Sequence, residues 1–448
     1  MKAIIENYKI KNNLLYPVLA AAAFLAAYKF VSTKIALALA LLLISLPFFA
    51  KRKFLMLNLF ILGYNFLPDI VSIAGALAIL AMYLVDVYIY KKESLRINSS
   101  FVVIALGVIM MIIGTVTSVK PLGSMRDLAM NFAGLAIFLS VNIAVKNKDD
   151  YNKIATSLAI NAALICLWGI VQYKFFGTVR REWLDSQVAG QISKRAYSVF
   201  MNPNVFAEYI VLVVPIVVSL FWAHKDAFKK FVYLCIVALM LLSLMLTFSR
   251  GGIMSLGVAA LVFLFFQARP LIVVALPFFL LALSFLPENI KRRIMSISNV
   301  KDSSTSYRFR IWSITKDVIR DHPVVGVGFG HKPFKYVFER YIRSMPIFHA
   351  HNTYLEMMAE GGFTGFISFV LIIITAIAQE IKLIYKAKSS EVKTFAAGLL
   401  AATLGILTHA MFEHIVYIYR IIVVLWLVLG LVSALKNINV DEQKLDNI

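Results

Sequence analysis

The stretch that decides the fold is residues 349–385, HAHNTYLEMMAEGGFTGFISFVLIIITAIAQEIKLIY. It passes from a polar loop into an apolar run at 362–385. That run is long enough to cross a bilayer, which takes about 20 residues. Similar runs recur along the 448 residues, 60% of which are hydrophobic. A soluble domain does not need so much apolar surface, so the sequence predicts an all-α, polytopic membrane helix bundle of about 12–14 transmembrane helices.

The apolar runs, counted one by one, predict fourteen spans. The third and fourth are separated only by Pro68-Asp69, which leaves open whether they are two helices or one. Cys166 and Cys235 both lie inside apolar runs, so neither a disulfide framework nor a thiolate metal site is indicated. The predicted spans are 14–31, 34–50, 54–69, 71–90, 100–119, 127–146, 154–176, 204–223, 231–248, 251–267, 270–287, 362–385, 393–413 and 416–436.

The basic residues predict which way the chain crosses the membrane. The net charge is +21, from 45 Lys and Arg against 24 Asp and Glu. Most of this excess lies in short loops between spans, where it sets topology rather than indicating a nucleic-acid partner. We read the first apolar run as a retained span and not a signal peptide. Both termini are then predicted to be cytoplasmic, and the long loops 177–203 and 288–351 to lie outside.

These assignments divide the chain into N-terminal spans (1–190), a core that includes the long outer loop (191–370) and C-terminal spans (371–448). Within the outer loop, 308–320 and 332–345 are amphipathic and predict interfacial helices that roof a cavity. From 288 to 350 the loop has twelve basic and five acidic residues. This excess fits attraction to anionic lipid headgroups, or arginines that hold a diphosphate, and the count leaves both open.

His351 is the candidate catalytic base. Asn352 is a favourable helix N-cap, so His351 is predicted to lie at the positive end of a helix dipole. That field disfavours the imidazolium ion and keeps the ring in the form that accepts a proton. Helix starts also attract phosphates, and together these features indicate group transfer from a phosphorylated donor. The alternative is an interfacial histidine that is hydrogen-bonded in a cap.

Arginines near two other span ends are candidates for phosphate binding. Arg250, in the turn TFSRGG (247–252), needs an anionic partner or interfacial water, and the two glycines after it would let a ligand approach the backbone. Its alternative is a snorkelling arginine at a tight turn. Arg195 precedes a predicted helix start at 202–204. Glu208, one turn into that span, is either a functional group or the salt-bridge partner of Arg195 or Arg250.

These motifs occur in one order along the chain: Arg195 before Asn202-Pro203-Asn204, then Ser249-Arg250-Gly251-Gly252, then Arg308, Trp312, His322-Pro323 and Gly326-x-Gly328, and finally His351-Asn352 before Gly362-x-x-Gly365. The ordered set resembles the O-antigen ligase and O-antigen polymerase superfamily of bacterial membrane glycosyltransferases. The resemblance covers about residues 190–370, and the remaining spans match only as a pattern.

The resemblance implies a metal-independent enzyme, without a cofactor, at the outer face of the bacterial cytoplasmic membrane. Its donor would be a glycan carried on undecaprenyl diphosphate, its acceptor a glycan or another hydroxyl, and its surroundings membrane lipids. His351 would be the catalytic base, Arg250 and Arg195 would bind the diphosphate, and Arg308 matches a recurrent loop arginine. Asn352 and Glu208 complete the predicted substrate site. The outer-face residues show no acidic cluster with metal-ligand spacing in the sequence.

Three functions remain open at this stage. Fourteen spans favour a polymerase, which extends one lipid-linked glycan with another. A ligase or protein O-oligosaccharyltransferase would instead move the glycan to a lipid core or a protein hydroxyl. A transporter or flippase of lipid-linked glycans would need paired charges inside several spans and related halves. Asp86, Glu208 and His409 are ionisable groups of the predicted spans, but the sequence shows no inverted halves.

Overall fold

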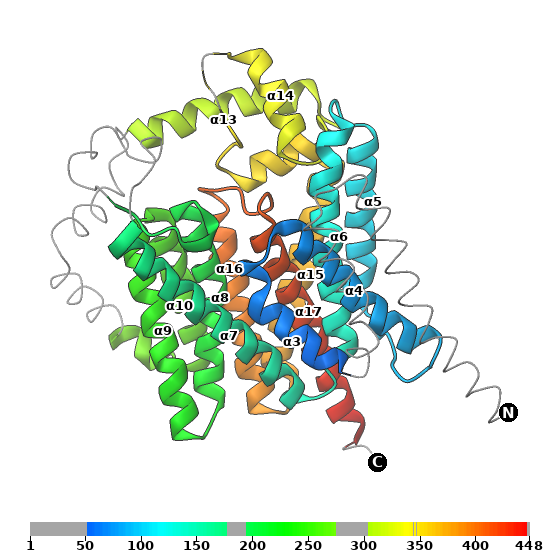
Figure 1. Cartoon of the computed structure of the whole chain (residues 1–448), viewed down its shortest axis with the longest axis vertical. Helices are drawn as coiled ribbons and strands as arrows, with labels where there is room; N and C mark the ends of the chain where they lie inside the picture. Colours follow the sequence, from blue (N-terminus) through cyan, green and yellow to red (C-terminus); the bar gives the residue numbers. More distant parts are fainter. Residues whose placement is uncertain (1–51, 177–193, 275–302, 344, 346, 446–448) are drawn as a thin grey trace.

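The computed structural model describes residues 52–176, 194–274, 303–343, 345 and 347–445, and this part of the chain is helical, without a β-strand. Ten of its helices are long and apolar enough to cross a membrane. They pack into one polytopic bundle (Figure 1), which confirms the predicted fold class. The predicted spans 14–31 and 34–50, and most of 270–287, lie outside the described residues.

The ten long helices are α4 (Asp69–Tyr88), α5 (Ser99–Val116), α6 (Pro121–Ala144), α7 (Lys148–Val171, continued by a π-helical turn Gln172–Phe176), α8 (Pro203–Ala223), α9 (Ala227–Thr247), α10 (Arg250–Gln267), α15 (Thr353–Lys386), α16 (Ser390–His409) and α17 (Tyr419–Leu445). A shorter apolar helix, α3 (Lys53–Gly63), runs into a 3-10 turn (Tyr64–Phe66) before α4. Pro68 is the N-cap residue of α4, so the predicted runs 54–69 and 71–90 are two helices.

Helices α8, α16 and α17 are mostly buried and form the centre of the bundle. Helix α8 packs against α9, α10 and α16, and α17 packs against α6. Small residues allow these close approaches. A Cβ atom added to Gly134 of α6 would fall 2.1 Å from Trp426 of α17, and one added to Gly405 of α16 would fall 2.9 Å from Ala259 of α10. Close packing of this kind holds helices together where lipid removes the hydrophobic driving force.

Three helix starts are capped as the sequence predicts. The side chain of Asn202 accepts a hydrogen bond from a backbone N–H at the start of α8. Ser249 does the same for α10, and Asn352 for α15. Each cap satisfies a backbone donor that has no partner within its own helix. The caps therefore fix where α8, α10 and α15 begin, all beside the predicted site.

Two further helices, α13 (Ser303–Asp321) and α14 (His331–Tyr341), cover one end of the bundle at the top of Figure 1. We call them, with the connector 322–330 between them, the roof. Its apolar core is separate from that of the bundle and includes Ile311, Val318, Phe334 and Phe338. These helices confirm the two predicted amphipathic segments. Tyr341, the last residue of α14, is 39% exposed.

Gly362 joins the roof to the bundle. It interrupts α15 with a left-handed backbone (φ 59°, ψ −163°), a region that is essentially open only to glycine. A Cβ atom there would lie 2.3 Å from the carbonyl oxygen of Val324 in the connector. Beyond the interruption, the N–H of Phe363 donates to the carbonyl of Pro323 at 2.8 Å. The break therefore exposes backbone groups of α15 that hold the connector in place.

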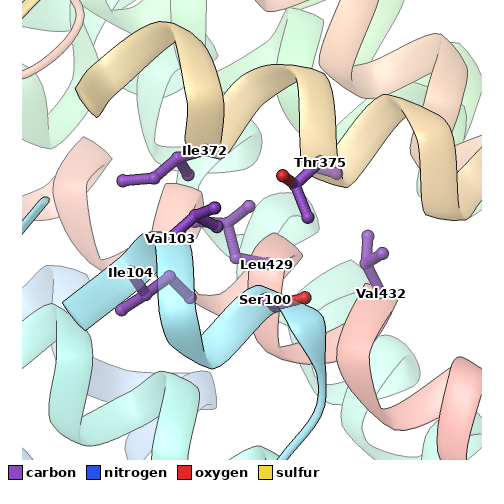
Figure 2. A pocket seen from close by; sticks show the side chains of 8 residues that line it. Ser100, Val103, Ile104, Ile372, Thr375, Leu429 and Val432 are labelled. Atoms are coloured by element: carbon purple, nitrogen blue, oxygen red, sulfur yellow. The ribbon is translucent and has the colours of Figure 1, made fainter. Parts of the chain in front are cut away.

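A small cavity lies inside the bundle between α5, α15 and α17 (Figure 2). Its volume is about 10 Å³, and Ser100, Ile372, Thr375 and Leu429 are among the residues that line it. A cavity of this size holds about one water molecule. It is too small for a lipid tail or a sugar.

Candidate functional site

His351 lies at the roofed end, directly before the cap of α15. Its backbone is left-handed (φ 52°), a conformation that non-glycine residues rarely adopt and that often marks functional sites. Thr353, which follows the cap residue Asn352, holds this geometry with two hydrogen bonds. Its N–H donates to the carbonyl of Ala410 at 2.8 Å, and its hydroxyl donates to the carbonyl of Glu413 at 2.9 Å. The start of α15 is thus fastened to the segment between α16 and α17.

The imidazole of His351 pairs with Glu413, a residue that the sequence analysis did not single out. Its Nδ1 lies 2.8 Å from Oε1 of Glu413, and Nε2 of His349 lies 3.3 Å from the same oxygen. The backbone N–H of His351 donates to Nδ1 of His349 at 3.2 Å. His349 therefore accepts at Nδ1 and carries its proton on Nε2, facing the carboxylate.

Glu413 is ionised in this setting. Burial alone would raise its pKa, but His351, His349 and Arg308 outweigh burial and hold the pKa of Glu413 well below its usual range. Burial and the neighbouring His351 lower the pKa of His349 well below its usual range, so that ring is neutral. An ionised carboxylate accepts only, so Nδ1 of His351 carries the proton that faces Glu413.

The remaining nitrogen of His351, Nε2, has no hydrogen bond to the described residues. The side chain is 29% exposed, whereas His349 and Glu413 are almost completely buried. The pair therefore combines a partly exposed ring, whose Nε2 has no hydrogen bond among the described residues, with a buried carboxylate at Nδ1. A histidine oriented in this way by a carboxylate acts as a general base in other enzymes.

Arg195 reaches this pair through Asn204. Nδ2 of Asn204 donates to Oε2 of Glu413 at 3.1 Å, and Oδ1 of Asn204 accepts from Nη2 of Arg195 at 3.1 Å. Nε of Arg195 also donates to the carbonyl of Thr247 at 2.7 Å. The guanidinium is 7% exposed. The structure thus connects Arg195, the start of α8 and the turn 247–252 to the carboxylate that orients His351.

Arg250 and Arg308 lie at the same end of the molecule. Arg250 is the first residue of α10, and a Cβ atom added to the next residue, Gly251, would lie 3.6 Å from the ring of His409. Arg308, on α13, lowers the pKa of Glu413 from across the site. A Cβ atom at Gly252 would lie 2.7 Å from Ala207, so Gly252 makes room for α8.

Glu208 and Asn352 border this group. Glu208, in the second turn of α8, is 1% exposed, and neither of its oxygens has a hydrogen-bond partner among the described residues. The pKa of Tyr417 is raised well above its usual range by burial, then by Glu413 and by Glu208. Glu208 therefore lies close to the pair of His351 and Glu413. Asn352 caps α15 and also donates to the carbonyl of Met411 at 3.4 Å. Its contacts are those of a structural cap.

Two groups of histidine and glutamate side chains at this end are close enough to hold a metal ion: His349, His351 and Glu413, and Glu356, Glu360 and His414. In the first group, hydrogen bonds use both oxygens of Glu413 and Nδ1 of His349, while Nε2 of His349 lies 3.3 Å from Glu413. Sequence spacing did not reveal either group, because about 60 residues separate the third member of each group from the other two. The available signal was a Glu-His pair at the end of a span, where ionisable residues are rare.

Comparison with known proteins agrees with the geometry. Residues 235–370 match the O-antigen ligase family (Wzy_C), and this region contains Arg250, Arg308, the roof and His351. The exopolysaccharide production protein ExoQ of Rhizobium meliloti (strain 1021) is 32% identical over 89 residues, which are 18% of this chain and 20% of that relative. The chain therefore matches about a fifth of the relative's length.

A likeness to a solved structure is weaker. A chain from a structure titled "Structural coordination of polymerization and crosslinking by a peptidoglycan synthase complex" covers 76% of this chain and 98% of its own length, with 14% identity and a TM-score of 0.44. A score this low does not establish a common fold. Residues 235–370 of this chain are thus similar to the O-antigen ligase family, and the 89 residues aligned with ExoQ are similar to a protein named for exopolysaccharide production.

Proposed function

We propose that the protein is a glycosyltransferase that polymerises glycan repeat units carried on undecaprenyl diphosphate, at the outer face of the cytoplasmic membrane. The observation that carries the proposal is the contact of 2.8 Å between His351 and Glu413, at the end of the bundle where Arg195, Arg250 and Arg308 also lie. The family match supports a lipid-linked glycan and an acceptor as substrates. ExoQ, whose name refers to exopolysaccharide production, supports a role in making a surface glycan.

In this proposal, Nε2 of His351 takes the proton from the acceptor hydroxyl while that oxygen attacks the anomeric carbon of the donor glycan. The new carbon–oxygen bond forms as the bond to the diphosphate oxygen breaks, with inversion at that carbon. Undecaprenyl diphosphate leaves with the electron pair. Glu413 stabilises the imidazolium through Nδ1, and His349 and Asn204 hold Glu413 in place. Proton removal by a positioned base contributes about 10²–10⁴-fold to such rates.

The positive charge needed by the leaving diphosphate would come from arginines. Arg250 and Arg308 are our candidates for direct contact, because guanidinium groups bind phosphate oxygens in pairs. Arg195 is already bonded to Thr247 and Asn204, so we assign it to ordering the site and adding charge from behind. Donors fixed before the reaction stabilise charge that develops in the transition state. The reaction then needs neither a metal ion nor a cofactor.

The arrangement of the loops supports an outward-facing site. The lysine-rich connections α6–α7, α8–α9 and α15–α16 lie at the end of the bundle away from the roof (Figure 1). Cytoplasmic loops carry the excess of Lys and Arg, so the roofed end would face outward. Helix α17 also ends away from the roof, as expected for a cytoplasmic C-terminus. In this orientation the isoprenoid tail would lie between spans, with its diphosphate at the outer interface.

The test is incubation of the purified protein with lipid-linked repeat units alone. We expect longer glycans and free undecaprenyl diphosphate. His351→Ala should form neither, whereas His224→Ala, at the C-terminal end of α8, should behave as wild type. Product that forms only after a lipid core or a protein acceptor is added would replace the polymerase by a ligase. Movement of the lipid across vesicles without a new glycosidic bond would indicate a flippase.

A further inference from the structure

The second histidine–glutamate group lies beside the catalytic pair and takes no part in the mechanism above. Glu356 and Glu360 are one turn apart at the start of α15, and His414 comes from the segment between α16 and α17. All three are at most 1% exposed, and one ligand atom from each lies within 4.8 Å of the others. We propose that this group binds one divalent first-row transition-metal ion, such as Mn²⁺ or Zn²⁺.

The hydrogen bonds of the two carboxylates point to a ligand between them. Oε2 of Glu356 accepts from the N–H of Ala350, and Oε2 of Glu360 accepts from the N–H of Gly330 at 2.9 Å. The other oxygen of each carboxylate is buried and has no hydrogen-bond partner among the described residues. Buried polar atoms without partners are costly and call for an explanation.

The pattern differs from that of the catalytic pair. There, hydrogen bonds use both oxygens of Glu413 and Nδ1 of His349, and Nε2 of His349 lies 3.3 Å from the carboxylate. In the second group, Oε1 of Glu360 faces Nε2 of His414 at 3.9 Å, too far for a hydrogen bond. Carboxylates that bind metals commonly use their other oxygen in an outer hydrogen bond that fixes their orientation. Glu356 and Glu360 both have that arrangement.

The chemistry of the group favours a particular class of ion. Two carboxylates and one neutral imidazole match a charge of +2. An imidazole ligand suits Mn²⁺ and Zn²⁺ better than Mg²⁺ or Ca²⁺, which prefer oxygen alone. Ligand atoms about 2.0–2.2 Å from a metal lie about 3–4.4 Å from each other, so small side-chain movements suffice. Asp127 and His331, paired at 3.2 Å, lie next to the group.

The place of the ion in the fold gives it a positioning role. It would join α15 to the segment between α16 and α17. That segment bears His414 and, directly before it in the chain, Glu413. Through Gly330 and Ala350 the same carboxylates hold the connector of the roof and the segment before α15. The ion would thus fix the position of Glu413 relative to His351 without touching the reacting atoms. Its presence can be measured whether or not the protein transfers glycans.

The experiment is a titration of purified full-length protein, freed of metals, with MnCl₂ followed by electron paramagnetic resonance, and with ZnSO₄ as competitor. We expect about one Mn²⁺ per chain in the wild type. Glu360→Gln keeps the acceptor for Gly330 but removes the charge, and should weaken binding at least tenfold. His351→Ala, in the other group, and Glu391→Gln, at the opposite end of the molecule, should retain one ion.

A second readout needs no variant. Spin-echo spectra of bound Mn²⁺ should show coupling to one histidine nitrogen, because this group has one histidine and the catalytic group has two. No binding above background in the wild type would overturn the proposal and would leave the carboxyls to share protons. Coupling to two histidine nitrogens, or binding that His351→Ala removes and Glu360→Gln retains, would overturn it as well.

Discussion

Replacing Glu413 by glutamine tests the orientation of His351 with the smallest change of shape. Glu413 contacts three nitrogen atoms: it accepts from Nδ1 of His351 at 2.8 Å and Nδ2 of Asn204 at 3.1 Å, and Nε2 of His349 lies 3.3 Å away. A glutamine has only one acceptor oxygen. If that oxygen faces the histidines, its NH₂ group meets the NH₂ group of Asn204. Asn204 cannot turn over without losing its bond to Arg195.

The opposite placement of the amide is also unfavourable for catalysis. Its NH₂ group would face Nδ1 of His351 and move the ring proton to Nε2, the nitrogen that must accept a proton. The loss of the negative charge of Glu413 lowers the rate further. At 2.8 Å and an effective dielectric constant of about 20, the attraction between the carboxylate and a protonated His351 is about 6 kcal/mol. With His351 29% exposed, solvent screening leaves about half, which corresponds to a rate loss of about 10²-fold.

The assay is single-turnover transfer from a lipid-linked repeat unit, with donor affinity measured separately. We expect Glu413→Gln to lose about 10²-fold or more in the rate of bond formation while donor affinity changes less than about threefold. A purely structural role would lower affinity and thermal stability together. A variant that transfers at the wild-type rate, or that loses rate only because it no longer binds the donor, would refute the assignment of Glu413.

The remaining predictions concern the base, the donor site, the roof and the metal. His351→Ala should lower bond formation by about 10²–10⁴-fold with donor binding retained, and transfer at the wild-type rate would remove the base. Arg250→Lys keeps the charge but loses the paired hydrogen bonds, so donor dissociation constants should rise about 10–100-fold, which equilibrium binding measures. Gly362→Ala should destabilise the protein by about 3 kcal/mol in thermal or denaturant unfolding, whereas Gly365→Ala, with open space around it, should not. Transfer by Glu360→Gln should be insensitive to chelator and to added Mn²⁺, because arginines supply the charge; stimulation by the ion would put a metal in the reaction.

Much of the fold could be predicted from the sequence because its signals are local. The length of an apolar run fixes a span, and a side chain such as Asn202, Ser249 or Asn352 fixes where a helix starts. The spacing of apolar residues in 308–320 and 332–345 likewise predicted α13 and α14. The separation of α3 from α4 needed the structure, because Pro68 can end one helix or only bend it.

The site was predicted only in part, since its partners come from distant segments. The ordered motifs indicated His351 and the three arginines, but nothing local connects His351 to Glu413, 62 residues later. The sequence analysis considered only the field of the α15 helix start, whereas Glu413 adds an opposing field at 2.8 Å. Glycines were also ambiguous. Gly252 has no side chain because α8 packs against it, and Gly362 has none because the connector 322–330 packs against it. Neither packing partner is adjacent to its glycine in the sequence.

The most direct test of the central claim is a single-turnover reaction with a radiolabelled lipid-linked repeat unit and excess purified protein. It counts undecaprenyl diphosphate released for each new glycosidic bond, in the wild type and in His351→Ala. We predict one lipid diphosphate per bond in the wild type, and bound donor without release in the variant. Equal release by the two proteins, or new bonds without release of the lipid diphosphate, would contradict the account.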